Sequence, residues 1–192
     1  MLTAPPTSRI NHDLEPDADI ETPLVPHNHP ALWSPCPEFD FQNPSRDPNE
    51  YAHVLARALI QHKGYGLAAP QLGHSIRAFV MMTQPSMTVC FNPEILDTGE
   101  QDDTLPEGCL SFPGIEVKVP RFTAIKARFS LPNGEGVTTT FAGLTARIFQ
   151  HELEHLEGLN FTRQTTRLEL ELAIKKARKR GFKYFPGNFR GV

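Results

Sequence analysis

The sequence lacks an apolar run of the roughly 20 residues that a transmembrane helix needs. It also lacks the basic start and apolar centre of a secretory signal. Neither sign of charge dominates, because 22 acidic against 19 basic residues leave a net charge of −3. The composition therefore predicts neither membrane association nor the basic footprint of a DNA-binding protein.

Cysteine is scarce as well. The three cysteines, Cys36, Cys90 and Cys109, cannot all pair, and they do not form the pattern of a disulfide framework. This favours a reducing compartment. We expect Cys36 and Cys90 to be small buried residues of the core.

The length of 192 residues fits one main domain with a sizeable core. Residues 1–29 are rich in Pro, Asp, Glu, His and Asn and offer little to bury, so we expect an extended or mobile arm. The main domain is predicted to span residues 30–184, and residues 185–192 are expected to form a tail.

The chemistry of the sequence centres on the H-E-x-x-H motif at residues 151–155. On a helix, His151 and His155 project from one face, one turn apart, and can bind Zn²⁺ or another divalent transition metal. Glu152 can then reach a water on the metal, as in metal-assisted hydrolases. The motif is short, however, and by itself it also fits an ordinary helix surface.

The third ligand decides between these interpretations. In the metzincin pattern the third ligand is a histidine, but Phe161 stands at that position here and cannot bind a metal. A thermolysin-like site would need a downstream glutamate, and the candidates Glu169 and Glu171 belong to a charged segment that is typical of a solvated helix. Cys109 offers a thiolate, and together with the two histidines it would leave a fourth tetrahedral position for water.

Local signals predict an α+β fold, in which antiparallel sheets surround a central helix that carries the metal motif. One helix is expected from Asp47, an N-cap before Pro48, to Gly64. A second helix begins with the capping box at Thr166 and continues to about residue 180. Strands are predicted at residues 76–82, 88–91, 114–119, 122–131 and 137–141, with a hairpin turn at 133–134. The helix that carries the metal motif is predicted at residues 142–158.

Three motifs occur in order: G-Y-G-L-A-A-P-Q at 64–71, E-G-C-L-S at 107–111 and Q-H-E-L-E-H at 150–155. By itself, the first motif would indicate only a glycine turn that leads to a strand. Together, the three resemble the signature motifs of the peptide deformylase family. The chain departs from the family pattern at Glu154, where aspartate is usual, and at Tyr65, where an aliphatic residue is common.

The resemblance implies hydrolysis of the N-terminal formyl group of formyl-methionine on nascent polypeptides, with release of formate. Cys109, His151 and His155 would bind the metal, and Glu152 would be the general base and then the general acid for the attacking metal-bound water. By resemblance, the Gln71 side chain and the Leu110 backbone N–H would stabilise the oxyanion.

We expect the peptide to add as a strand beside Tyr65 and Gly66 and near Gly108, where small residues leave the backbone accessible. Three residues share the helical face of His151 and are predicted to border the pocket for the first side chain: Leu144, Arg147 and Ile148. For Arg147, a surface salt bridge is the alternative.

A Cys/His/His site accepts Fe²⁺, Zn²⁺, Ni²⁺ or Co²⁺, and the resemblance implies Fe²⁺ as the working metal with Zn²⁺ as a common occupant. The basic run at 175–180 is either a solvated helix end or a contact for ribosomal RNA. The resemblance favours the cytoplasm of a bacterium or of a virus-infected host cell, and an organelle stays open. Two alternative functions remain compatible with the sequence: a metallopeptidase with Glu169 or Glu171 as a metal ligand, and a non-catalytic binding module.

Overall fold

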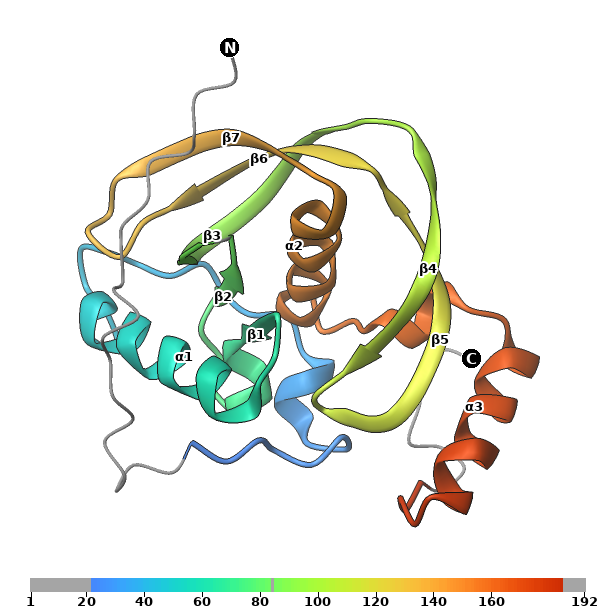
Figure 1. The fold of residues 1–192 in the computed structure, drawn as a ribbon. Coiled ribbons are helices and arrows are strands. Elements are labelled where there is room, and N and C mark those ends of the chain that lie inside the picture. Colours follow the sequence, from blue (N-terminus) through green and yellow to red (C-terminus); the bar gives the residue numbers. More distant parts are fainter. Residues whose placement is uncertain (1–21, 84, 185–192) are drawn as a thin grey trace.

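The computed structural model describes residues 22–83 and 85–184. This part of the chain is α+β, with two antiparallel sheets and three α-helices, which confirms the predicted class (Figure 1). The larger sheet has the order β1-β2-β3-β6-β7 and the smaller sheet pairs β4 with β5. The strands are β1 Gly66–Ala68, β2 Ala78–Met82, β3 Met87–Thr98, β4 Gln101–Cys109, β5 Phe112–Phe122, β6 Ala124–Ser130 and β7 Gly136–Ala142.

Helix α1 (Pro48–His62) begins where the sequence predicted, because the Asp47 carboxylate accepts two backbone N–H groups of the first turn. Its predicted end is wrong by one residue. Lys63, with φ of 54°, takes the left-handed position that we expected of Gly64. At Gly64 a Cβ would lie 2.9 Å from Cδ1 of Leu110, so the glycine leaves room for that side chain.

Two strands were not predicted. β4 is an acidic stretch containing Pro106, and such a sequence has little intrinsic strand propensity. It is nevertheless paired along its length with β5, and proline is tolerated in a strand of a two-stranded sheet that has a free edge. β1 is too short to give a periodic signal and depends on its pairing with β2. Both strands reach the site described below.

Helix α2 (Gly143–Leu156) contacts strands of both sheets, namely β1, β2, β5, β6 and β7 (Figure 1). Its side chain Phe149 is fully buried and packs edge-on against Phe79, with ring centroids 5.1 Å apart, and against Phe141 at 5.6 Å. Aromatic packing of this kind fixes the rotation of the helix about its axis. The face that carries the H-E-x-x-H motif is oriented by this packing.

Helix α3 (Arg167–Lys179) starts with the predicted capping box, in which Thr166 and Glu169 cap each other. It packs on β5 through Leu170, Ala173 and Ala177. Three short 3-10 helices complete the described elements: η1 Pro30–Trp33, η2 Ala69–Leu72 and η3 Phe161–Gln164. No helix in the described ranges is long and apolar enough to span a membrane.

Residues 22–29, which we expected to belong to the arm, contact the domain. The Thr22 hydroxyl donates to Gln61 Oε1 at 2.7 Å, and the Thr22 carbonyl lies 2.7 Å from Nε2 of His62. Further along, the Val25 N–H donates to the Gln71 carbonyl at 2.9 Å. Residues 1–21 and the tail at 185–192 lie outside the described residues, so their predicted roles stay predictions.

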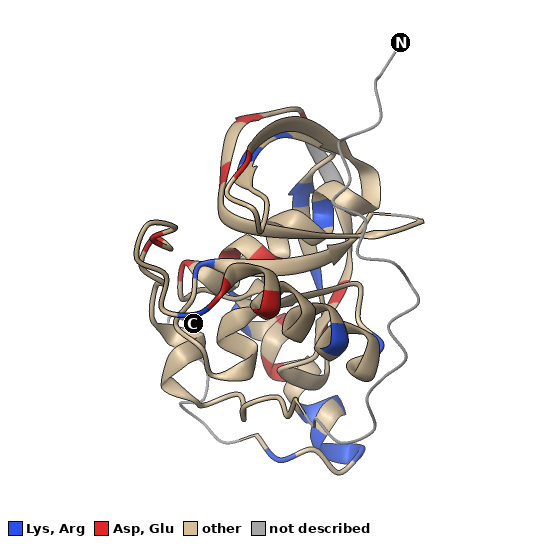
Figure 2. Cartoon of the chain, turned by 90° about the vertical axis from the view of Figure 1, so that its left-hand side faces the viewer, with Lys and Arg blue, Asp and Glu red and all other residues tan. Residues whose placement is uncertain are grey.

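Figure 2 shows basic and acidic residues interspersed over one side of the molecule, without a face of a single sign. This distribution agrees with the small net charge of −3.

We predict that Gly158→Ala destabilises the fold. Gly158 follows α2 with φ of 67°, and a Cβ would lie 2.7 Å from the backbone carbonyl carbon of Ser34. The left-handed conformation and the overlap with fixed backbone should together cost about 2 kcal/mol or more. Urea denaturation measures this loss. Gly136→Ala, where a Cβ meets nothing within 4 Å, is the matched control, and equal midpoints for the two variants would contradict the prediction.

Candidate metal centre

Three side chains from two elements form a candidate metal centre. Cys109 is the last residue of β4, and His151 and His155 lie one turn apart on α2. Their ligand atoms all lie within 4.8 Å of one another, and Cys109 Sγ is 3.2 Å from His155 Nε2. One sulfur and two imidazole nitrogens at this spacing fit a single divalent transition metal.

The surroundings of the two imidazoles differ. Nδ1 of His151 lies 3.0 Å from Oε2 of Glu107, which leaves its Nε2 to face the centre. Burial opposes the charged form of His151, but hydrogen bonds with Cys109 and Glu107 outweigh it and raise its pKa. For His155, burial and then the neighbouring His151 lower the pKa, which favours the neutral ring.

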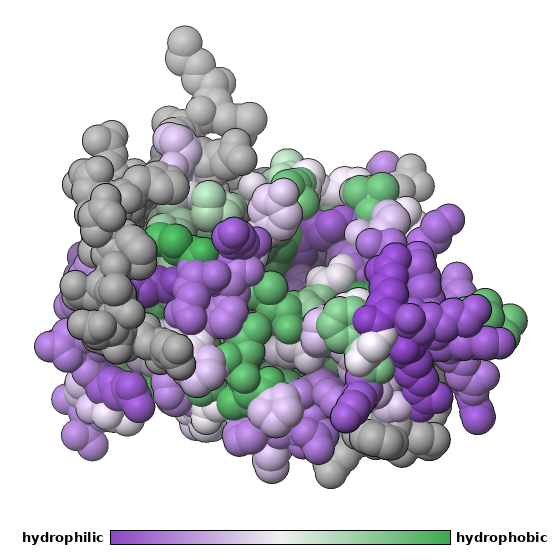
Figure 3. All heavy atoms as spheres, turned by 60° about the horizontal axis from the view of Figure 1, so that its bottom comes forward, coloured by the Kyte–Doolittle hydropathy of each residue, from purple (hydrophilic) through white to green (hydrophobic). Residues whose placement is uncertain are grey.

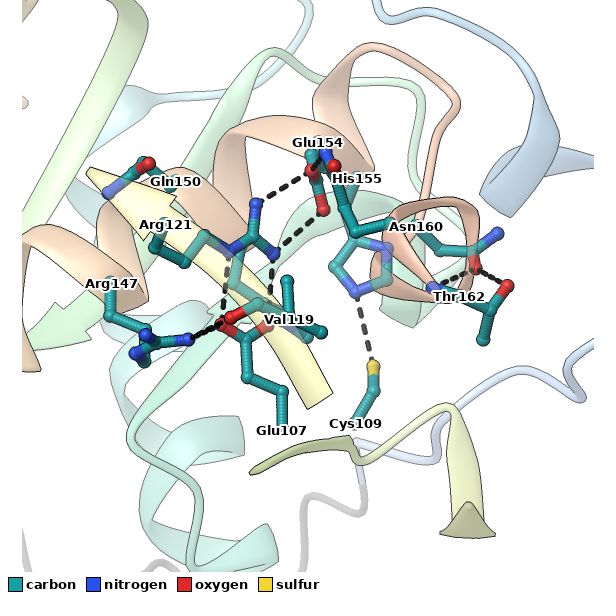
Figure 4. A network of polar contacts seen from close by, with 12 residues as sticks. Glu107, Cys109, Val119, Arg121, Arg147, Gln150, Glu154, His155, Asn160 and Thr162 are labelled. Carbon is teal, nitrogen blue, oxygen red and sulfur yellow. Dashed lines mark hydrogen bonds and ion pairs between the residues drawn. The ribbon is translucent and has the colours of Figure 1, made fainter. Parts of the chain in front are cut away.

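Glu107 is the centre of a buried polar network (Figure 4). Its carboxylate accepts two hydrogen bonds from Arg121, at 3.0 and 2.9 Å, and one from Arg147 at 2.6 Å, besides its contact with His151. Burial alone would raise the pKa of Glu107, but the hydrogen bonds from His151 and Arg121 lower it to about 2. Glu107 is therefore an anion that links β4, β5 and α2 beside the candidate metal ligands.

Arg121 extends this network to the residue before His155. Its guanidinium donates to both carboxylate oxygens of Glu154, at 2.7 and 2.9 Å. Gln164 of η3 also donates to Glu154, at 2.9 Å. The departure from the family pattern at Glu154 thus keeps a bidentate ion pair that fixes the last turn of α2 against β5.

The candidate acid–base Glu152 points into a tight space. The residue is 4% exposed, and burial raises its pKa to about 7. A Cβ on Gly66 would lie 2.8 Å from Cδ of Glu152. The glycine of β1 therefore makes room for this carboxylate, a role that the sequence did not indicate.

Gln71 is held by the first turn of η2. Its Oε1 accepts the Ala68 N–H at 2.8 Å, so its amide nitrogen points toward the centre. That nitrogen donates to Ser111 Oγ at 3.2 Å and lies 3.5 Å from Cys109 Sγ. Leu110, whose backbone N–H is the other predicted oxyanion donor, lines a cavity together with Gln71 and Cys109.

The centre opens into a cavity of about 500 Å³. The cavity is lined by every residue predicted to bind substrate, namely Tyr65, Gly66, Gly108, Leu144, Arg147 and Ile148. Tyr65 and Leu144 are 65% and 58% exposed, so two large apolar groups lie at the surface there. Figure 3 shows one face of the molecule, on which apolar residues gather in the middle between hydrophilic residues.

Two sequence alternatives need correction. Arg147 does form an ion pair, but the pair with Glu107 is buried and not on the surface, and the same nitrogen also donates to the Val119 carbonyl. Glu169 caps α3 and Glu171 pairs with Arg167, so both carboxylates are engaged on the surface of α3. Among the described residues, the candidate metal group contains neither of them.

No role was predicted from the sequence for Glu107, Arg121 or Ser111. Glu107 and Ser111 stand inside the E-G-C-L-S motif, and their closeness to Cys109 was a usable signal. Arg121 had no such signal, because its partners Glu107 and Glu154 are distant in the sequence and meet only through the β4–β5 pairing.

These features define a class: an α+β protein with a candidate mononuclear metal centre of Cys/His/His type and a buried glutamate beside it. The model of the polypeptide deformylase family matches residues 21–171. The chain therefore belongs to the polypeptide deformylase family.

Individual relatives agree. The peptide deformylase of Thermotoga petrophila is 42% identical over 105 residues, which cover 55% of this chain and 64% of that protein. The peptide deformylase of Aquifex aeolicus is 38% identical over 127 residues, with coverage of 63% and 75%. The crystal structure of a peptide deformylase from Synechococcus elongatus in complex with actinonin has a TM-score of 0.77 and 29% identity, covering 90% of this chain and 94% of that one. The match to the Thermotoga petrophila protein thus spans slightly less than two thirds of that relative.

We predict that Cys109→Ala abolishes tight metal binding, because the site loses its only thiolate. Metal content and the thiolate-to-metal absorption band of the Co²⁺ form are the measurements. Cys36→Ala, at a buried cysteine outside the group, is the matched control and should keep both. Retention of the thiolate band in Cys109→Ala would show that a different residue is the ligand.

Proposed function

We propose that the chain removes the N-terminal formyl group from formyl-methionyl peptides of nascent polypeptides and releases formate. The observation that carries this proposal is the group of Cys109, His151 and His155 beside a cavity that the buried Glu152 also lines. Membership of the polypeptide deformylase family supports the choice of a formyl group over other amides. In this proposal α2 is the central catalytic helix and both sheets position residues around it.

Cys109, His151 and His155 would hold the metal, which when bound supplies a Lewis acid and lowers the pKa of water. The chain contributes the proton transfers. Glu152, with a pKa raised to about 7 by burial, is suited to accept a proton from the attacking water and to deliver it to the departing amine. The burial of its carboxylate shields that proton from bulk solvent.

The negative charge that develops on the formyl oxygen needs donors that are already in place. The Gln71 amide and the Leu110 backbone N–H are the proposed donors. Two contacts support the choice of Gln71: its oxygen is fixed by Ala68, and its nitrogen lies against Cys109 and Ser111. A fixed amide has little reorganisation to undergo when the charge forms.

The peptide is proposed to extend β1, which is an edge strand of the larger sheet. Gly66 and Tyr65 would offer backbone groups on one side of the peptide, and Gly108 of β4 would face its other side. Leu144 and Ile148 would enclose the first side chain, which suits methionine because both are apolar and line the cavity.

We propose Fe²⁺ as the working metal, with Zn²⁺, Ni²⁺ or Co²⁺ able to occupy the same ligands. We also propose that the reaction takes place in the cytoplasm, where thiolates such as Cys109 stay reduced.

The end of α3 is proposed to contact ribosomal RNA. Lys175, Lys176 and Lys179 lie in its last turns, all partly or fully exposed. Contacts with phosphates would weaken steeply as salt is raised.

We predict that Glu152→Gln lowers kcat/KM for formyl-Met-Ala-Ser by about 10²–10⁴ while the metal stays bound, because only the proton acceptor is lost. Formate release and metal content are measured on anaerobically purified protein. Glu157→Gln, which breaks a surface ion pair with Arg77 at the end of the same helix, is the matched control. Gly66→Ala should also be slow with its metal retained, because a Cβ there displaces the Glu152 carboxylate.

Two results would contradict the proposal. Undiminished activity in Glu152→Gln would remove its acid–base role and favour a binding function. A metal-loaded parent protein that releases no formate would keep the metal centre and exclude the substrate, and unformylated peptides would then test the metallopeptidase alternative.

A further inference from the structure

One wall of the cavity is formed by the junction of β4 and β5, here called the β4–β5 turn (residues 109–114). The strands reverse between Cys109 and Phe112, which are paired partners. Cys109, Leu110 and Pro113 all line the cavity. The turn therefore carries a proposed metal ligand, a proposed oxyanion donor and part of the surface that faces a bound peptide.

The segment after α3 returns to this turn. Gly181, with φ of 93°, reverses the chain, and the Arg178 guanidinium donates to the Tyr184 carbonyl. Tyr184 is 3% exposed, and its hydroxyl donates to the Pro113 carbonyl at 2.7 Å. This hydrogen bond joins the C-terminal segment directly to a residue that lines the cavity.

The neighbouring residue of the turn is fixed by a second contact. Gly114 has φ of 78°, and a Cβ there would overlap the ring of Phe182. Phe182 therefore packs directly on the backbone of the turn. The ring of His27, a residue near the start of the described chain, lies against the ring of Tyr184, with ring centroids 4.8 Å apart. Tyr184 is thus enclosed and its hydroxyl is held in place.

We propose that Phe182 and Tyr184 are positioning residues for the substrate-facing wall. Neither lines the cavity, so each acts only through the backbone of residues 113–114. Both lie beyond residue 171, where the match to the family model ends. The inference rests on the proposed formyl-peptide substrate.

The test compares Tyr184→Phe with Tyr51→Phe. Each variant removes one hydroxyl from a buried tyrosine, and the Tyr51 hydroxyl contacts His74 away from the cavity. For Tyr184→Phe we expect KM for formyl-Met-Ala-Ser to rise about fivefold, which corresponds to the net free energy of one lost hydrogen bond. We expect kcat and the thiolate band of the Co²⁺ form to be unchanged, because Cys109 stays on β4. Phe182→Leu should shift KM in the same direction.

A role in stability alone would lower the active fraction, and hence kcat, without changing KM. An unchanged KM in Tyr184→Phe, with or without a lower kcat, would overturn the inference. An equal rise of KM in Tyr51→Phe would also overturn it. Failure of the proposed function is distinguishable, because the parent protein would then release no formate at all.

Discussion

The carboxylate of Glu107 is the interaction on which the site depends. It is buried, it carries a negative charge, and it accepts hydrogen bonds from Arg121, Arg147 and His151. Glu107 is two residues from Cys109 on β4, whereas His151 is on α2. One anion therefore links the strand that carries Cys109 to the helix that carries His151, two of the three candidate metal ligands. Removing one partner from such a buried ion pair typically costs about 3–5 kcal/mol.

The network also explains how a small sheet and a helix can form a defined cavity. Arg121 on β5 binds Glu107 and Glu154 together, so that both ends of the metal motif are held to the smaller sheet. On the other side of α2, Gly66 of the larger sheet leaves room for the Glu152 carboxylate. The candidate metal ligands thus face the smaller sheet, and Glu152 faces the larger one. The cavity lies between them.

Much of this arrangement could be predicted because its signals are local. The N-cap Asp47 and the capping box at Thr166 mark helix starts, and the turn at 133–134 marks a hairpin, each within a few residues. The grouping of Cys109 with the two histidines followed from ligand chemistry and from the resemblance. What could not be predicted depends on residues distant in the sequence: the pairing that makes an acidic stretch into β4, and the ion pairs of Arg121.

The most direct test of this account is the metal affinity of Glu107→Gln. Glutamine keeps the shape of the side chain but removes the charge that orients His151, and we predict a metal affinity about 10–100 times weaker. Glu94→Gln is the control, because its ion pair with Arg128 is exposed. The measurement is competition for Co²⁺ or Zn²⁺ with a chelator, on folded protein. An affinity equal to that of the parent would show that the metal ligands are positioned without Glu107 and would contradict the account.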